Sequence, residues 1–294
     1  MARRTLPILA LSVIFLLILA VRADQTILFE KDSPFNHIIV REDEPNVRAL
    51  LFEKNGAIQS LVNMADPDDM RLPYTRAMPV GLAFTEAPER VLIIGLGGGV
   101  LPGLFHRHFP TMVIDVVDID PDVIDAARQF FGFKEDKRLK AFEADGRKFV
   151  EESKEKYDAV FLDAYGNDSI PYHLATREFL QSVRRILTPK GVVVGNVWSR
   201  ASNRLYDSMR RTYQDSFEEL YIFDILASAN KIFVAVPRRG KVGKEEMVKR
   251  SKDLAKKAGF RFDLGSTVTY GYTYVTDLRI EAPILKDGKE PPAK

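Results

Sequence analysis

Three aspartates, each at the end of a predicted strand, are the residues whose types and spacing could do chemistry together. Asp118 follows Val116-Val117, Asp145 follows Ala144, and Asp163 follows a run that ends at Leu162. In a parallel α/β sheet the carboxyl ends of the strands meet at one edge, and ligands bind there. We therefore predict that the three carboxylates share one cleft.

A glycine-rich turn lies upstream of the first aspartate. The apolar run Val91–Ile94 leads into Gly95-Leu96-Gly97-Gly98-Gly99, and a helix is predicted to follow. Glycine permits close backbone approach to a ligand, and the start of a helix offers unpaired N–H groups. We predict that Gly95 and Gly97 approach a nucleoside. A tight turn that needs glycine only for packing is the alternative.

The aspartates take different expected roles in such a site. A carboxylate about 20 residues after the glycine-rich turn accepts hydrogen bonds from ribose hydroxyls, and Asp118 fits this position. Asp145, with Gly146 after it, could accept from the exocyclic amine of adenine, or could simply cap a helix. Asp163 beside a sulfonium could hold an amine nucleophile and accept its proton, or could cap a loop.

Apolar strands and amphipathic helices alternate along most of the chain and must position these groups. Such alternation predicts a parallel sheet that is covered on both faces. The predicted strands are Val91–Gly95, Val113–Asp118, Leu139–Glu143, Ala159–Asp163, Gly191–Val197, Leu220–Asp224 and Lys231–Val236. The predicted helices are Thr75–Thr85, Leu101–His108, Pro121–Phe130, Gly146–Lys154, Thr176–Leu187, Ala201–Ser216 and Lys244–Ala258. The expected fold is an α/β, class I methyltransferase-like (Rossmann-like) doubly wound sheet.

Four segments are predicted along the chain. Residues 1–23 form a signal peptide or membrane anchor, and residues 24–73 a small N-terminal β domain with strands at Thr26–Phe29, His37–Val40 and Ala49–Phe52. Residues 74–240 form the nucleoside-binding α/β domain, and residues 241–294 a C-terminal helix and tail.

The first segment carries Arg3 and Arg4 before an apolar run from Leu6 to Val21. Its length lies between a signal-peptide core and a comfortable span, so cleavage and anchoring both stay open. Arg22 beside the run favours an anchor. We expect a protein that is membrane-anchored or exported.

Composition excludes several classes of function. Lysine and arginine total 43 against 41 acidic residues, and this balance gives no footprint for nucleic acid. The chain has no cysteine and four histidines, so thiolate catalysis is excluded and no metal site is expected. His106 and His108 are two residues apart, which does not place them on one helical face.

With these motifs, the chain resembles the spermidine synthase (polyamine aminopropyltransferase) family from Thr26 to Pro237. The glycine-rich turn is similar to that family's nucleoside loop, and Asp118 stands where the family usually has Glu. Asp145 and Gly146 resemble its adenine-contacting segment, and Asp163 the carboxylate that deprotonates the attacking amine.

Further matches and departures concern the amine. Gln59 is similar to the family's nucleoside-contacting Gln, and Tyr74 to a Tyr beside the amine channel. Gly98 replaces the Asp that anchors the aminopropyl amine, which suggests a wider cleft. Arg76 is expected to repel a polyamine, and Asp168 stands in for a second carboxylate.

The resemblance implies a transferase that uses decarboxylated S-adenosylmethionine, or S-adenosylmethionine, as co-substrate and binds no permanent cofactor. The expected reaction is transfer of an aminopropyl (polyamine) group to a small-molecule amine or polyamine. A methyltransferase and a catalytically silent, membrane-tethered nucleoside-binding module are the alternatives. Relatives of this kind commonly associate, so a homodimer is also expected.

Overall fold

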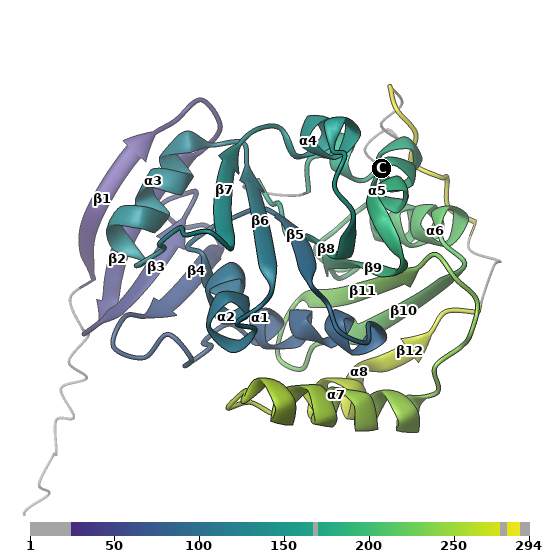
Figure 1. Cartoon of the computed structure of the whole chain (residues 1–294). Helices are drawn as coiled ribbons and strands as arrows, with labels where there is room; N and C mark the ends of the chain where they lie inside the picture. Colours follow the sequence, from purple (N-terminus) through teal and green to yellow (C-terminus); the bar gives the residue numbers. More distant parts are fainter. Residues whose placement is uncertain (1–24, 167–169, 277–280, 289–294) are drawn as a thin grey trace, which may run out of the picture.

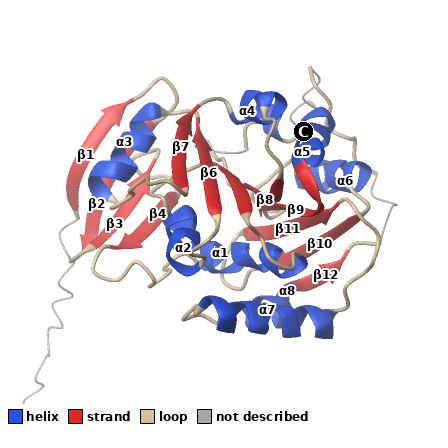
Figure 2. Cartoon of the chain, viewed as in Figure 1, coloured by secondary structure: helices blue, strands red, loops and turns tan. Residues whose placement is uncertain are grey.

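The computed structural model describes residues 25–166, 170–276 and 281–288, which form two β-sheets with flanking helices (Figures 1 and 2). Residues 1–24, with the expected signal peptide or anchor, lie outside the described residues, so that expectation stays a prediction. Within the described residues, no helix is long and apolar enough to cross a membrane.

The smaller sheet is a four-stranded antiparallel meander in the order β1-β2-β3-β4. Its strands are β1 (Thr26–Asp32), β2 (His37–Glu44), β3 (Val47–Leu51) and β4 (Ile58–Asn63), and the sequence did not predict the last of these. One face of the sheet buries Ile38, Val40 and Leu50 against Val123 of helix α3 (Pro121–Phe130) and against Phe131. This sheet therefore shares its core with the larger domain.

The larger sheet has the order β12-β10-β11-β9-β8-β5-β6-β7. Its strands are β5 (Arg90–Ile94), β6 (Val113–Asp118), β7 (Leu139–Glu143), β8 (Tyr157–Leu162), β9 (Leu187–Trp198), β10 (Glu219–Asp224), β11 (Asn230–Val236) and β12 (Tyr272–Tyr274). Strands β5 to β9 pair in parallel. Strand β11 pairs antiparallel with β9, and β10 pairs antiparallel with β11 and β12. The strand order reverses direction at β5 and β8, which gives the predicted doubly wound sheet and places its ligand edge there.

Helices cover both faces of the large sheet (Figure 1). They are α1 (Pro73–Ala77), α2 (Val100–His108), α3 (Pro121–Phe130), α4 (Gly146–Glu152), α5 (Arg177–Ile186), α6 (Tyr206–Ser216), α7 (Lys244–Ala258) and α8 (Leu264–Gly271), with 3₁₀ turns η1 (Met78–Phe84) and η2 (Tyr172–Leu174). The buried side chains of α2, α7 and α8 pack against one face of the large sheet, and those of α4, α5 and α6 pack against the other face. The inner strands of the sheet are therefore buried on both sides, whereas the edge strands β7 and β12 are partly exposed.

Two helix predictions were wrong in detail. The helix expected at Thr75–Thr85 is α1 followed by the 3₁₀ turn η1, since Pro79 supplies no N–H to continue an α-helix. The helix expected from Ala201 begins at Tyr206. Before it, the Asn203 side chain accepts from the N–H of Leu205 and forms a turn instead.

Candidate active site

A cavity of about 600 Å³ lies at the carboxyl ends of β5, β6 and β8, where the small sheet meets the large one. This volume suits a small-molecule site. The predicted site residues that line it are Gln59, Tyr74, Gly95, Gly97, Asp118, Asp145, Gly146 and Asp163. Asp168 falls outside the described residues. The structure therefore brings together the groups that the sequence placed at one edge.

Asp118 holds the glycine-rich turn from the end of β6. Its Oδ2 accepts from the N–H of Leu96 at 2.8 Å, and its Oδ1 from the N–H of Asp120 at 3.0 Å. Burial raises the pKa of Asp118 to about 6, against the backbone hydrogen bonds, which favour the ionised form. Each carboxylate oxygen keeps a lone pair, so Asp118 could still accept from a ligand hydroxyl.

Gly95 is required by its backbone. It has a φ of +100°, and a Cβ there would lie 2.3 Å from the carbonyl oxygen of Asp163. The N–H of Asp163 in turn donates to the carbonyl of Ile94 at 2.9 Å. The glycine-rich turn and the Asp163 backbone are therefore in direct contact.

Asp145 has the structural role that the sequence left open. Its Oδ1 accepts from the N–H groups of Arg147 and Lys148 and caps α4. Its Oδ2 lies 3.2 Å from Nε2 of His173, which comes from η2 and also lines the cavity. Adenine contact by Asp145 remains a prediction.

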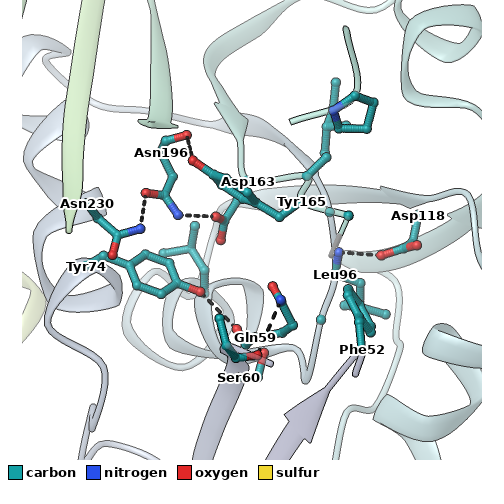
Figure 3. A pocket seen from close by; sticks show the side chains of 18 of the residues that line it. Phe52, Gln59, Ser60, Tyr74, Leu96, Asp118, Asp163, Tyr165, Asn196 and Asn230 are labelled. Atoms are coloured by element: carbon teal, nitrogen blue, oxygen red, sulfur yellow. Dashed lines mark hydrogen bonds between the residues drawn. The ribbon is translucent and has the colours of Figure 1, made fainter. Parts of the chain in front are cut away.

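Asp163 directly follows β8 and faces the cavity beside the buried amide of Asn196 (Figure 3). Its Oδ1 accepts from Nδ2 of Asn196 at 2.8 Å. Burial raises the pKa of Asp163 to about 7, and the Asn196 hydrogen bond opposes part of that rise. A carboxyl group that titrates near neutrality can exchange a proton with a substrate.

Aromatic side chains form the wall next to Asp163. The rings of Tyr165 and Trp198 stack with centroids 4.9 Å apart, and the Tyr165 hydroxyl donates to the carbonyl of Asn196. The Tyr74 hydroxyl donates to the carbonyl of Gln59 at 3.1 Å. Burial, and then the nearby Asp163, raises the pKa of Tyr74 and Tyr165, so both phenols stay neutral. Neutral rings beside a carboxylate suit the alkyl and ammonium parts of an amine.

The charge of this cavity is one-sided. Three aspartates line it, and among the described residues around it there is no lysine or arginine. Such a site favours cationic ligands and disfavours a phosphate-bearing dinucleotide.

Comparison with known proteins places the chain in a family. The model of the spermine/spermidine synthase domain matches residues 74–222. A polyamine aminopropyltransferase from Vibrio vulnificus (strain CMCP6) is 36% identical over 218 residues, which cover 72% of this chain and 72% of that protein. This chain belongs to the spermine/spermidine synthase family.

Solved structures agree on the fold. A probable spermidine synthase from Corynebacterium glutamicum ATCC 13032 matches with a TM-score of 0.71 and 18% identity over 90% of this chain and 98% of that one. Human methyltransferase-like protein 13, in complex with SAH, matches with a TM-score of 0.57 and 29% identity over 71% of this chain and 98% of that one. The fold of this spermine/spermidine synthase family member is therefore methyltransferase-like.

Two expectations about departures from the family need correction. Gly98 does not line the cavity, and a Cβ there would meet Ser60 and Phe131, so glycine at this position does not widen the cleft. Arg76 is exposed and is not among the cavity residues, so the expected repulsion of a cationic substrate is absent.

Several lining residues were missed by reasoning from the sequence. Ser60 accepts from the N–H of Gly98 at 2.8 Å and fixes the glycine-rich turn to the small sheet. Asn196, Trp198 and Asn230 come from β9 and β11. A polar Asn directly after the apolar run Val192–Val194 and Gly195 was the one available signal, because it repeats the pattern of the aspartates on other strands.

Proposed function

We propose that this spermine/spermidine synthase family member transfers an aminopropyl group from decarboxylated S-adenosylmethionine to an amine. The observation that carries the proposal is Asp163, a half-buried carboxyl with a pKa of about 7 in a cavity whose described lining has no cationic Lys or Arg. The family membership supports the same reaction class.

The proposed chemistry needs few groups. The nucleoside lies against Gly95, Gly97 and Asp118, and the acceptor amine enters between Tyr74 and Trp198. The nitrogen lone pair attacks the carbon next to the sulfonium sulfur, the C–S bond breaks, and its electron pair stays on sulfur as a neutral thioether. The proton that the nitrogen loses goes to Asp163.

Methyl transfer from S-adenosylmethionine is the second candidate. Position 98 lies outside the cavity lining, and the described lining has no carboxylate besides Asp118, Asp145 and Asp163 to anchor an aminopropyl ammonium. The human methyltransferase-like structure is also more similar in sequence than the probable spermidine synthase structure, at 29% against 18% identity. The two candidates differ in the donor and in the thioether that is released.

Mass spectrometry separates the candidates. Purified full-length protein is incubated with each donor and a panel of amines, and we expect 5′-methylthioadenosine from the decarboxylated donor. S-adenosylhomocysteine as the product would replace aminopropyl transfer by methyl transfer. Nucleoside binding in calorimetry without any product would leave the silent module instead.

Asp163→Asn should abolish transfer and leave nucleoside affinity within about tenfold of the wild type, because the asparagine accepts no proton. Asp253→Asn, at an exposed position on α7, is the matched control and should keep full activity. Wild-type turnover in Asp163→Asn contradicts the role given to this residue.

A further inference from the structure

Three polar side chains, Asn196, Asn230 and Ser228, form a hydrogen-bonded chain that ends at Asp163. Figure 3 shows its first two links, from Asp163 to Asn196 and from Asn196 to Asn230. Nδ2 of Asn196 donates to Asp163 at 2.8 Å, Nδ2 of Asn230 donates to Oδ1 of Asn196 at 2.8 Å, and the hydroxyl of Ser228 donates to Oδ1 of Asn230 at 2.6 Å. The N–H of Asn230 donates back to the Ser228 hydroxyl at 3.2 Å. The side-chain amides of Asn196 and Asn230 are therefore each held at both the oxygen and the nitrogen.

The direction of every donor follows from the charge on Asp163. An ionised carboxylate only accepts hydrogen bonds, so the NH₂ group of Asn196 must face it. The Asn196 oxygen then faces away and needs a donor, which the NH₂ group of Asn230 supplies. The Asn230 oxygen needs a donor in the same way, and a hydroxyl at position 228 provides it.

Burial makes this chain energetically significant. Asn196 is 2% exposed, and it lies in the sheet beside β11, where Ile232 is its partner in the register. A buried amide with an unsatisfied oxygen loses the full free energy of its hydration. Turning the Asn196 amide over would set its oxygen against the carboxylate and its NH₂ group against that of Asn230, so the observed arrangement is strongly preferred.

The other groups that face Asp163 do not replace this support. Tyr74 from α1 and Tyr165 after β8 are neutral phenols, with their hydroxyls donated to backbone carbonyls. The remaining titratable groups of the cavity are Asp118, Asp145 and His173. In the described structure, the hydrogen bond to the Asp163 carboxylate comes from Asn196.

We propose that Asn196, Asn230 and Ser228 are positioning residues, which favour the ionised form of Asp163 and keep its second oxygen turned to the acceptor amine. This inference rests on the proposed function for its purpose, but its physical content is independent of turnover. Breaking the chain at Asn230 frees the Asn196 amide to turn and removes support from the carboxylate. Asp163 then holds its proton to higher pH.

The chain is tested first without activity. Carbon-13 NMR follows the titration of the aspartate carboxyl groups in the full-length protein, and the Asp163 signal is identified by its loss in Asp163→Asn. We expect Asn230→Leu, which is uncharged, and Asn230→Asp each to raise the Asp163 midpoint by about one pH unit. Ser228→Ala should raise it by a few tenths of a unit, whereas Ser228→Thr, which keeps the hydroxyl, should match the wild type.

Controls separate the chain from simple charge. Gln129→Glu adds a negative charge on the exposed side of α3 and should leave the midpoint unchanged. A rise in Asn230→Asp without a rise in Asn230→Leu would show repulsion alone and overturn the chain. If Asn230→Leu does not fold, equal midpoints in Ser228→Ala and Ser228→Thr overturn it.

Kinetics add a second readout where turnover is found. The acid limb of kcat/KM should move up by about one pH unit in Asn230→Leu, so its activity falls about tenfold at pH 6 and approaches the wild-type value at pH 9. A loss that is equal at both pH values indicates general damage and contradicts positioning. A wild-type protein that transfers nothing refutes the proposed function, while the NMR result still decides the hydrogen-bond chain.

Discussion

Asp163 combines burial with a single side-chain hydrogen bond, and this combination gives it an unusual protonation behaviour. A cationic donor that could form a salt bridge with it is missing from the described cavity lining, which has no lysine or arginine. Its pKa therefore rises, mainly through burial, from 3.8 to about 7. The burial that makes Asp163 a proton acceptor near neutral pH also makes its ionised form destabilise the folded state.

The raised pKa of Asp163 predicts that the stability difference between the wild type and Asp163→Asn depends on pH. Between pH 4 and pH 7 the folded protein keeps a proton on Asp163 that the unfolded chain has released, so stability falls as the pH rises through this range. Asp163→Asn removes this fall. We expect the unfolding free energy of the variant, relative to the wild type, to increase by roughly 1–3 kcal/mol from pH 5 to pH 8. Urea titrations at both pH values measure it, and an unchanged difference would show that Asp163 titrates normally.

Asp118 predicts a loss of nucleoside binding by a different cause. Asparagine has one acceptor oxygen, so Asp118→Asn leaves the N–H of Leu96 or of Asp120 facing an NH₂ group. We expect nucleoside affinity to fall about tenfold to a hundredfold. Asp118→Glu keeps both acceptors and should stay within about fivefold of the wild type. Calorimetry with the thioether nucleoside measures both, and equal affinities in the three proteins would remove Asp118 from the site.

At this scale the sequence predicted the carboxylates better than their partners. Asp118 and Asp163 end apolar strands, and strand ends converge in a parallel sheet, so their meeting followed from periodicity. Asn230 is the first residue of β11, an antiparallel strand, and its approach to Asn196 depends on how that strand registers with β9. Register of this kind is set by packing of the whole sheet and is not visible in local sequence.

At the scale of elements, the segment 281–288 binds across the helices that cover one sheet face. Leu285 is fully buried, its carbonyl accepts from the N–H of Arg177, and its N–H donates to the hydroxyl of Thr212. Asp287 forms two hydrogen bonds with the guanidinium of Arg147, at 2.7 and 2.6 Å. Through these contacts the segment binds residues of all three helices, α4, α5 and α6.

Leu285→Ala tests how much the segment 281–288 contributes to the stability of the fold. The truncation leaves a cavity among buried side chains, and we expect a loss of about 2–4 kcal/mol in unfolding free energy. Leu226→Ala, at a position that is 66% exposed, should change stability by less than about 0.5 kcal/mol. Urea unfolding compares the two, and a similar small effect at both positions would mean that the segment contributes little.

The elements that the sequence missed share a physical reason. Helix α8 contains Gly265, Gly271 and several β-branched residues, which disfavour a helix locally. It forms because Asp263 caps it and because Leu264 and Val268 are buried in the core. Strand β12 likewise exists through its pairing with β10. Tertiary contacts outweigh local preference in both.

At the scale of the whole molecule, one buried carboxylate joins the two sheets. Asp120 is 0% exposed; its Oδ1 caps α3 at the N–H of Asp122, and its Oδ2 accepts from Ser33 and Asn36 in the β1–β2 turn. The local pattern, Asp120 directly before Pro121, indicates only the helix cap. The tie to the small sheet depends on residues more than 80 positions away and was outside the reach of local patterns.

Asp120→Asn should therefore weaken both the cap and the junction. The amide NH₂ group replaces one acceptor oxygen, and we expect a loss of roughly 1–3 kcal/mol in unfolding free energy. Asp125→Asn, on the exposed side of the same helix, is the matched control and should lie within about 0.5 kcal/mol of the wild type. Chemical denaturation measures both, and a variant as stable as its control would show that the junction is held by apolar packing alone.

The one-sided charge of the cavity has a consequence for turnover. Under the proposed chemistry the nucleoside enters as a sulfonium cation and leaves as an uncharged molecule, so the aspartates attract the incoming form and lose that attraction once the bond has broken. The thioether product should therefore bind more weakly than the sulfonium donor. Raising the salt concentration should lower the affinity for the sulfonium donor more than the affinity for the thioether product, so the ratio of the two affinities should fall.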